Sequence, residues 1–240
     1  SSGSASLVVA GAVPVTQVLQ KATRIWGVWV RKDDVPFTFL PPREPASRNV
    51  FLDDDPNTPA AQFVLGGLWP RRDDPSFYPA ILAARILQER LTKTLPTSLI
   101  TVGADARRLP GPFYVQGQAA ADQAVGEIRK ILDVVEALKI SGVTAEELAE
   151  AQSRWIQEFN NNLNSLDGIC KSILDSELYR LGTNYAASFP ELVRRANADM
   201  VKETAKEWVF PGGVLILVRG PSPTLKSGLE TLGSVQQITP

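Results

Sequence analysis

Two short, continuous apolar runs stand near the two ends of this chain. Leu7–Val13 and Val214–Val218 contain no charged residue. Runs of this length with no polar alternation are typical of strands that are covered on both faces. A helix is predicted after the first run, from about Thr16 to Trp26, because its apolar residues recur at helical spacing. The pattern therefore predicts two buried strands, one of them early in the chain.

Between these runs, short stretches bounded by turn residues predict further strands. Val50–Leu52 ends at an acidic turn, and Gln62–Leu65 ends at a break at Gly66-Gly67. The segments Leu99–Val102 and Phe113–Gln118 form a predicted pair, joined by a loop that contains Pro and Gly. In the second of these, apolar and polar residues alternate, so we expect one covered face and one open face.

The central part of the chain is predicted to be mainly helical. Thr144 and Glu147 stand at the spacing of a capping box and open one of these helices. Asn197 is the predicted N-cap of another. Helices are expected at about 76–93, 125–138, 144–159, 165–180, 190–196 and 198–209, followed by a short helix near Leu225 and a strand near 235–238.

Strands at both ends of the order and helices in the middle predict an α+β fold. We expect a two-layer sandwich, with a mixed, mostly antiparallel sheet and helices packed on one face. The sequence shows no internal repeat and no low-complexity segment, so residues 1–240 are predicted to form a single domain. Residues 1–6 look like a cut end or a tag scar, which suggests a domain excised from a longer chain.

Composition narrows the possible functions. Hydrophobic residues make up 44% of the chain and charged residues 21%, as in an ordinary globular protein. A net charge of −1 argues against nucleic-acid binding, and no apolar run is long enough to span a membrane. The single cysteine, Cys170, excludes an internal disulfide and is predicted to be a buried structural thiol.

The chain has no histidine. It therefore lacks the commonest zinc ligand and the commonest general base at neutral pH. The densest carboxylate cluster, Asp53-Asp54-Asp55, is predicted to be a solvated turn, and the Gly-Gly pairs match no nucleotide-binding motif. We assign no catalytic residue and no metal ligand, and the substrate-binding residues stay unknown.

Several phrases, in the same order along the chain, resemble the C-terminal half of insulinase- or pitrilysin-type zinc peptidases. The apolar run Leu7–Val13 and the helix end Ile25-Trp26-Gly27-Val28-Trp29 resemble the family's "LVVVGDV" and "FGDW". Arg107–Phe113 resembles "RRDPGAF", Val143–Gln152 resembles "VTEEELARAK", and Val214–Gly220 corresponds to the final "TIVVVG" strand. The resemblance implies the fold of a metallopeptidase half, also called LuxS-like.

The resemblance implies a non-catalytic half that pairs with a zinc-bearing half, fused or separate, and encloses a peptide-binding chamber. Zinc is then expected only in the partner, and the assembly would be a zinc metalloendopeptidase. The family's His-x-x-Glu-His is absent here. The segment Thr92–Ile100 also lacks the Arg and Tyr that contact peptide in relatives, so no family residue is carried over. We still expect this segment to face the chamber, with Leu95 and Leu99 in contact with the partner.

An alternative is a degenerate scaffold domain with no proteolytic role, and an independent enzyme that uses carboxylates alone is a further alternative. A His-x-x-Glu-His motif upstream in the gene or in a neighbouring gene would favour the peptidase half. The compartment is not fixed by the residues, and a bacterial periplasm is only a working guess.

The first testable prediction is that the chain holds no zinc of its own. A zinc site needs three or four converging Cys, His or carboxylate ligands, and carboxylates alone favour harder ions. Metal analysis after exhaustive dialysis should give far less than one equivalent of zinc. A tightly held, stoichiometric zinc would contradict this prediction.

Overall fold

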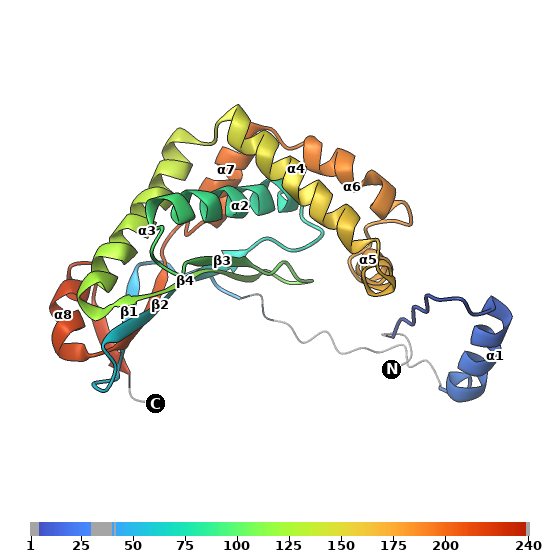
Figure 1. The fold of residues 1–240 in the computed structure, drawn as a ribbon. Helices are drawn as coiled ribbons and strands as arrows, with labels where there is room; N and C mark the ends of the chain where they lie inside the picture. Colours follow the sequence, from blue (N-terminus) through green and yellow to red (C-terminus); the bar gives the residue numbers. More distant parts are fainter. Residues whose placement is uncertain (1–4, 30–39, 41, 239–240) are drawn as a thin grey trace. The chain divides into compact units, whose positions relative to one another are not determined.

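The strands come together in one six-stranded sheet in the computed structural model, which describes residues 5–29, 40 and 42–238. The strands are β1 (Asn49–Asp54), β2 (Ala60–Trp69), β3 (Thr101–Ala104), β4 (Gly111–Ala120), β5 (Leu215–Gly220) and β6 (Val235–Ile238). The helices are α1 (Val15–Trp26), α2 (Phe77–Thr94), α3 (Ala121–Ser141), α4 (Ala145–Asn162), α5 (Leu166–Leu178), α6 (Tyr185–Arg194), α7 (Ala198–Trp208) and α8 (Ser222–Glu230) (Figure 1).

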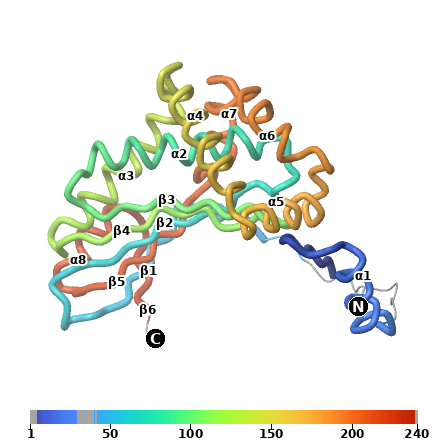
Figure 2. The backbone as a smooth tube through the Cα atoms, turned by 45° about the vertical axis from the view of Figure 1, so that its right-hand side comes forward, coloured from blue at the N-terminus to red at the C-terminus, as the bar shows by residue number. Residues whose placement is uncertain are grey.

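The sheet has the order β3-β4-β2-β5-β1-β6 (Figure 2). The long strand β2 is antiparallel to both of its neighbours, β4 and β5, and β3 is antiparallel to β4. In contrast, β1 runs parallel to β5 and to β6. The sheet is mixed and mostly antiparallel, so the predicted fold class is confirmed.

Helices cover one face of this sheet. The helices α2, α3, α7 and α8 pack against its strands and against one another (Figure 1). Every second residue of the inner strands points into this layer and is almost fully buried. These residues include Val50, Leu52, Ala61, Phe63, Leu65, Trp69, Phe113, Val115, Ile216 and Val218. The core therefore lies between the sheet and a single helical layer.

Two predictions about the inner strands are wrong. The run Val214–Val218 is not covered on both faces, because Leu215 and Leu217 stay 43% and 42% exposed. The pair Gly66-Gly67 does not end β2, which continues to Trp69. Its pairing with β4 carries the strand through the glycines, and a Cβ at Gly67 would lie 3.1 Å from the Phe210 ring. The close packing of Phe210 explains the absence of a side chain there.

The predicted early strand, Leu7–Val13, is also wrong. These residues form neither a strand nor a helix, and Leu7, Val9 and Val13 are each about half exposed. No ladder among the described strands includes them. A strand exists only where a neighbour accepts its backbone hydrogen bonds, and an apolar run alone does not supply that neighbour. The predicted helix after it is confirmed as α1.

The helical region agrees with the prediction except in details. Helix α6 begins at Tyr185 rather than at Pro190, which lies inside the helix. Cys170 was predicted to be buried but is only partly buried. Its helix, α5, contains no buried residue. Asn197 caps α7 by accepting a hydrogen bond from the Met200 backbone N–H at 2.9 Å. In the connector, Pro42 and Pro45 lie outside helices and strands, while Pro36 and Pro41 are outside the described residues.

By its contacts the chain divides into two compact units, residues 1–40 with 153–191 and residues 41–152 with 192–240. The second unit contains the whole sheet. In the first, Phe159 stacks on Phe189 with ring centroids 3.8 Å apart, and Trp155 and Tyr185 meet Phe189 edge-on. The single-domain organisation stays a prediction.

One ion pair joins α2 to the turn between α3 and α4. Arg90 donates two hydrogen bonds to the Glu147 carboxylate, each 2.8 Å long, and one to the Gly142 carbonyl oxygen. Glu147 also accepts from the Thr144 backbone N–H, while its own N–H donates to the Thr144 hydroxyl. The predicted capping box is thus confirmed. The hydrogen bonds from Arg90 are the main reason why the pKa of Glu147 falls from 4.5 to about 2.

We predict that Glu147→Gln destabilises the fold in a pH-dependent way. A carboxylate whose pKa is lower in the folded state stabilises fully above its unfolded pKa, and this contribution is lost as the pH falls toward the folded pKa. The variant should lose about 1–3 kcal/mol of unfolding free energy at pH 7. The difference from the parent should shrink steadily between about pH 5 and pH 2.

Urea unfolding at several pH values measures this effect. Glu146→Gln is the matched control, because Glu146 is an exposed acidic residue in the same first turn of α4. A control that loses as much stability as Glu147→Gln would show that the helix dipole, rather than Arg90, is responsible.

Candidate functional site

The face of the sheet away from the helices is open, and apolar side chains of β2 and β5 lie on it among polar ones. The register aligns residues of this face in rows across the strands. One row runs through Gln116 on β4, Val64 on β2, Leu217 on β5 and Phe51 on β1. None of these side chains is fully buried. Since the opposite residues of the same strands fill the core, the open face is a surface that this unit leaves uncovered.

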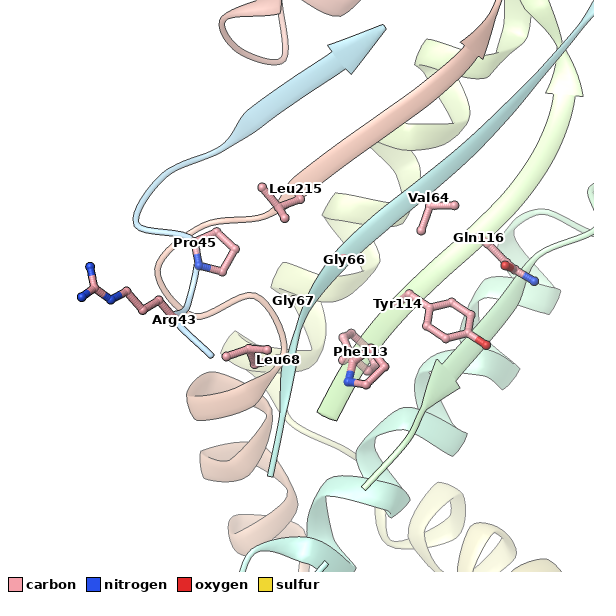
Figure 3. Close-up of a pocket in the computed structure, with 11 residues that line it drawn as sticks. Arg43, Pro45, Val64, Gly66, Gly67, Leu68, Phe113, Tyr114, Gln116 and Leu215 are labelled. Carbon is pink, nitrogen blue, oxygen red and sulfur yellow. The ribbon is translucent and has the colours of Figure 1, made fainter. Parts of the chain in front are cut away.

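A shallow pocket of about 400 Å³ lies on this face. Its lining comes from β2, β4 and β5 and from the segment before β1 (Figure 3). The residues are Arg43, Pro45, Val64, Gly66, Gly67, Leu68, Pro112, Phe113, Tyr114, Gln116 and Leu215. The lining is mostly apolar, and the side chains of Val64, Tyr114, Gln116 and Leu215 surround the glycines in the close-up (Figure 3).

Glycine at two positions shapes the pocket. Gly66 leaves its floor open, because only a backbone oxygen lies near the place of a Cβ there. At Gly103 on the neighbouring strand β3, a Cβ would collide with the Tyr114 ring. Tyr114 and Gly103 are direct cross-strand partners. The missing side chain at Gly103 thus lets the Tyr114 ring lie across β3.

Charged groups lie at the margins of the open face. Arg43 lines the pocket, and partial burial raises the pKa of the adjacent Glu44, against the effect of a hydrogen bond from the Leu68 backbone. At the other end of β5, Arg219 pairs with Asp53 at 3.7 Å and with Asp55 at 3.2 Å. Asp54 accepts from the Ser222 backbone N–H at 2.8 Å. The acidic turn therefore joins β1 to β5 and to the start of α8.

The residues that line the pocket include few groups that take part in catalysis. A hydrolase needs a nucleophile or an activated water with a base in hydrogen-bond reach, and the pocket lining contains neither a carboxylate nor a hydroxyl other than Tyr114. Among the described residues, no group of three or more His, Cys, Asp or Glu could hold a metal ion. The zinc of the resembling family therefore does not fit the residues that the structure describes. The open face can bind through shape and apolar contact.

The segment expected to face a chamber, Thr92–Ile100, runs from the end of α2 to the start of β3. Leu95 and Ile100 are buried in the helical layer, with 4% and 8% exposure, while Leu99 is 83% exposed. The segment does not line the pocket. It leads into Thr101, the cross-strand partner of the lining residue Gln116. The chamber-facing role of Leu99 stays a prediction, but Leu95 is a core residue and does not present its side chain to a partner.

The pocket was not predicted from the sequence. Alternation in β4 indicated an open face, whereas β5 begins with a continuous apolar run and β2 has only one polar residue, Gln62, so their sequences did not indicate an open face. One available signal was Gly66-Gly67 within a continuing strand pattern, because glycine inside a strand often marks a close approach of another group.

Solved structures share this fold at low sequence identity. The chain superposes on a peptidase M16 inactive domain from Pseudomonas fluorescens with a TM-score of 0.74 and 18% identity, over 87% of this chain and 52% of that protein. For a protease from Helicobacter pylori, the TM-score is 0.72 and the identity 13%, over 87% and 53%. For the periplasmic protease PqqL from Escherichia coli, the values are 0.68 and 14%, over 88% and 24%.

The chain spans about half the length of the Pseudomonas and Helicobacter proteins and about a quarter of PqqL. No curated protein matches it in sequence. None of the helices in the described ranges is long and apolar enough to cross a membrane. The model of one family, the peptidase M16 inactive domain, matches residues 1–154, which is well over half of the sequence. The chain therefore belongs to the family of peptidase M16 inactive domains.

Proposed function

We propose that this chain is the non-catalytic half of an insulinase-type zinc metallopeptidase. It pairs with a zinc-bearing half, fused or separate, and the two halves enclose a chamber that holds a peptide. The zinc and the general base are supplied by the partner. The assembly is then a zinc metalloendopeptidase, whereas the isolated chain does not cleave peptides.

One observation carries this proposal: the family's fold is present, with its sheet left open and apolar on one face. Leu215, Leu217 and Tyr114 lie on that face, and each stays at least partly exposed. A monomeric protein rarely leaves a contiguous apolar surface without a use for it. An inactive half-enzyme with such a face contributes a chamber wall.

The chemistry of the wall suggests how a peptide is held. The pocket offers apolar side chains and a glycine floor, with Arg43 as the one cationic group of the lining. An extended peptide with an apolar side chain fits this surface better than a strongly charged one. The pocket thereby adds binding energy at a distance from the reacting bond, which in an enzyme supports positioning.

We predict that activity requires both halves. The isolated chain, incubated with unfolded peptides with and without added zinc, should give no cleavage above a buffer control. Addition of the zinc-bearing half encoded in the same genome should produce cleavage that chelators abolish. If the chain cleaves peptides alone and in the presence of chelators, the carboxylate-only enzyme is correct. If the pair binds but never cleaves, the scaffold role is correct.

We further predict that Leu215→Asp weakens peptide use by the assembly. Leu215 lines the pocket and is partly exposed, so a carboxylate there places an unpaired charge against the bound peptide. The KM of an apolar peptide should rise by about tenfold, equivalent to the loss of one buried side-chain contact.

Ile140→Asp is the matched control for this variant. Ile140 is 70% exposed near the end of α3, in the helical layer. Both variants should keep the circular dichroism spectrum and the thermal midpoint of the parent within a few degrees. Equal KM values for the two variants would contradict the assignment of the open face as a peptide wall.

A further inference from the structure

The N-terminal segment formed by residues 7–27 is rich in apolar side chains, and the structure leaves most of them exposed. Helix α1 has no buried residue. Val15, Leu19 and Ile25 are 71%, 60% and 57% exposed. The preceding run Leu7–Val13 is equally uncovered and forms no strand. Such a surface needs a partner, because leaving several large apolar side chains in water forfeits their burial energy.

The same chain contains a second segment with the same pattern. In both, an apolar run leads to a proline that serves as the N-cap without a side-chain hydrogen bond, Pro14 for α1 and Pro221 for α8. Apolar residues follow at the fourth, eighth and eleventh positions after each proline, and a glycine ends each segment. They are Val18, Ala22, Ile25 and Gly27 in the first, and Leu225, Leu229, Leu232 and Gly233 in the second. The two segments therefore share one short pattern of apolar positions.

The second copy shows what such a unit packs against. Strand β5 lies between β1 and β2 in the sheet, and its residues Ile216 and Val218 are fully buried. Helix α8 returns over the sheet and packs on α3, β1 and β6 (Figure 1). Leu225 and Leu229 on its inner face are 0% exposed. The unit is thus an inner strand and a covering helix of an α+β half.

We propose that residues 7–27 complete the sheet of the zinc-bearing half. The run Leu7–Val13 enters that sheet as an inner strand, in the manner of β5, and α1 covers it in the manner of α8. The occupant of this surface is therefore a second α+β half of the same fold, and the contact is strand addition together with helix packing. This assignment rests on the pairing proposed above and names the segment that makes the pairing.

The test measures binding of the full chain to the zinc-bearing half from the same genome, produced as a separate protein, by isothermal titration calorimetry. Val9→Asp places a charge in the donated strand, and Ile25→Asp places one on the apolar face of α1. Gln20→Asp is the control, because Gln20 is an exposed residue on the opposite, polar face of the same helix. Each of the first two should weaken binding by at least about tenfold, and the control by less than about twofold.

The outcomes separate this assignment from the proposed function. If the parent binds and both test variants bind equally well, the assignment is overturned while the pairing stands. If the parent does not bind, the pairing and the assignment both fail.

Measurements on the isolated chain address the other possible occupants. None of the three variants should change its thermal midpoint by more than a few degrees, since the segment contains no buried residue. A large loss of stability would place the segment on its own chain. A dimer of the isolated chain that Val9→Asp dissociates would identify a second copy as the occupant. Either result overturns the assignment.

Discussion

The one-sided cover of the sheet is the constraint on which the rest of the structure depends. Side chains alternate between the two faces of a strand, so each inner strand has one set of residues for the helices and another for whatever lies opposite. The first set is buried beneath the helices that contact the sheet. The second set, with Val64, Leu215 and Leu217 among it, stays partly exposed. A stable half with an apolar, uncovered face follows from this single arrangement.

Local chemistry made much of the fold predictable. The capping box at Thr144 and Glu147, the cap at Asn197 and the helical spacing in α3 each specify their element within a few residues of sequence. The predictions that were wrong concern features that depend on residues distant in sequence. Whether an apolar run is covered on two faces, on one or on none is decided by the strands and helices beside it, which is why β5 and Leu7–Val13 differ although their sequences look alike. The pocket was not predicted for the same reason, since its walls come from strands that are remote in sequence.

The absence of histidine can be interpreted together with the open face of the sheet. A chain without the usual metal ligand and general base is also compatible with a scaffold domain that has no proteolytic role. Here the family and the open face together favour a domain that shapes a space and leaves the chemistry to its partner. The segment of residues 7–27 agrees with this picture, because α1 has no buried residue and its apolar side chains stay exposed in the structure.

Protection of the open face in the assembly is the most direct test of this account. A thiol introduced by Leu217→Cys, in a Cys170→Ser background, reports on the middle of that face, and Ile140→Cys reports on the helical layer. Their labelling rates with a thiol reagent would be compared for the isolated chain and for the complex with the zinc-bearing half and an uncleaved peptide. The account predicts that the thiol at 217 is strongly protected in the peptide-loaded complex and that the thiol at 140 labels at an unchanged rate. Equal labelling at 217 in the free chain and in the complex would contradict it.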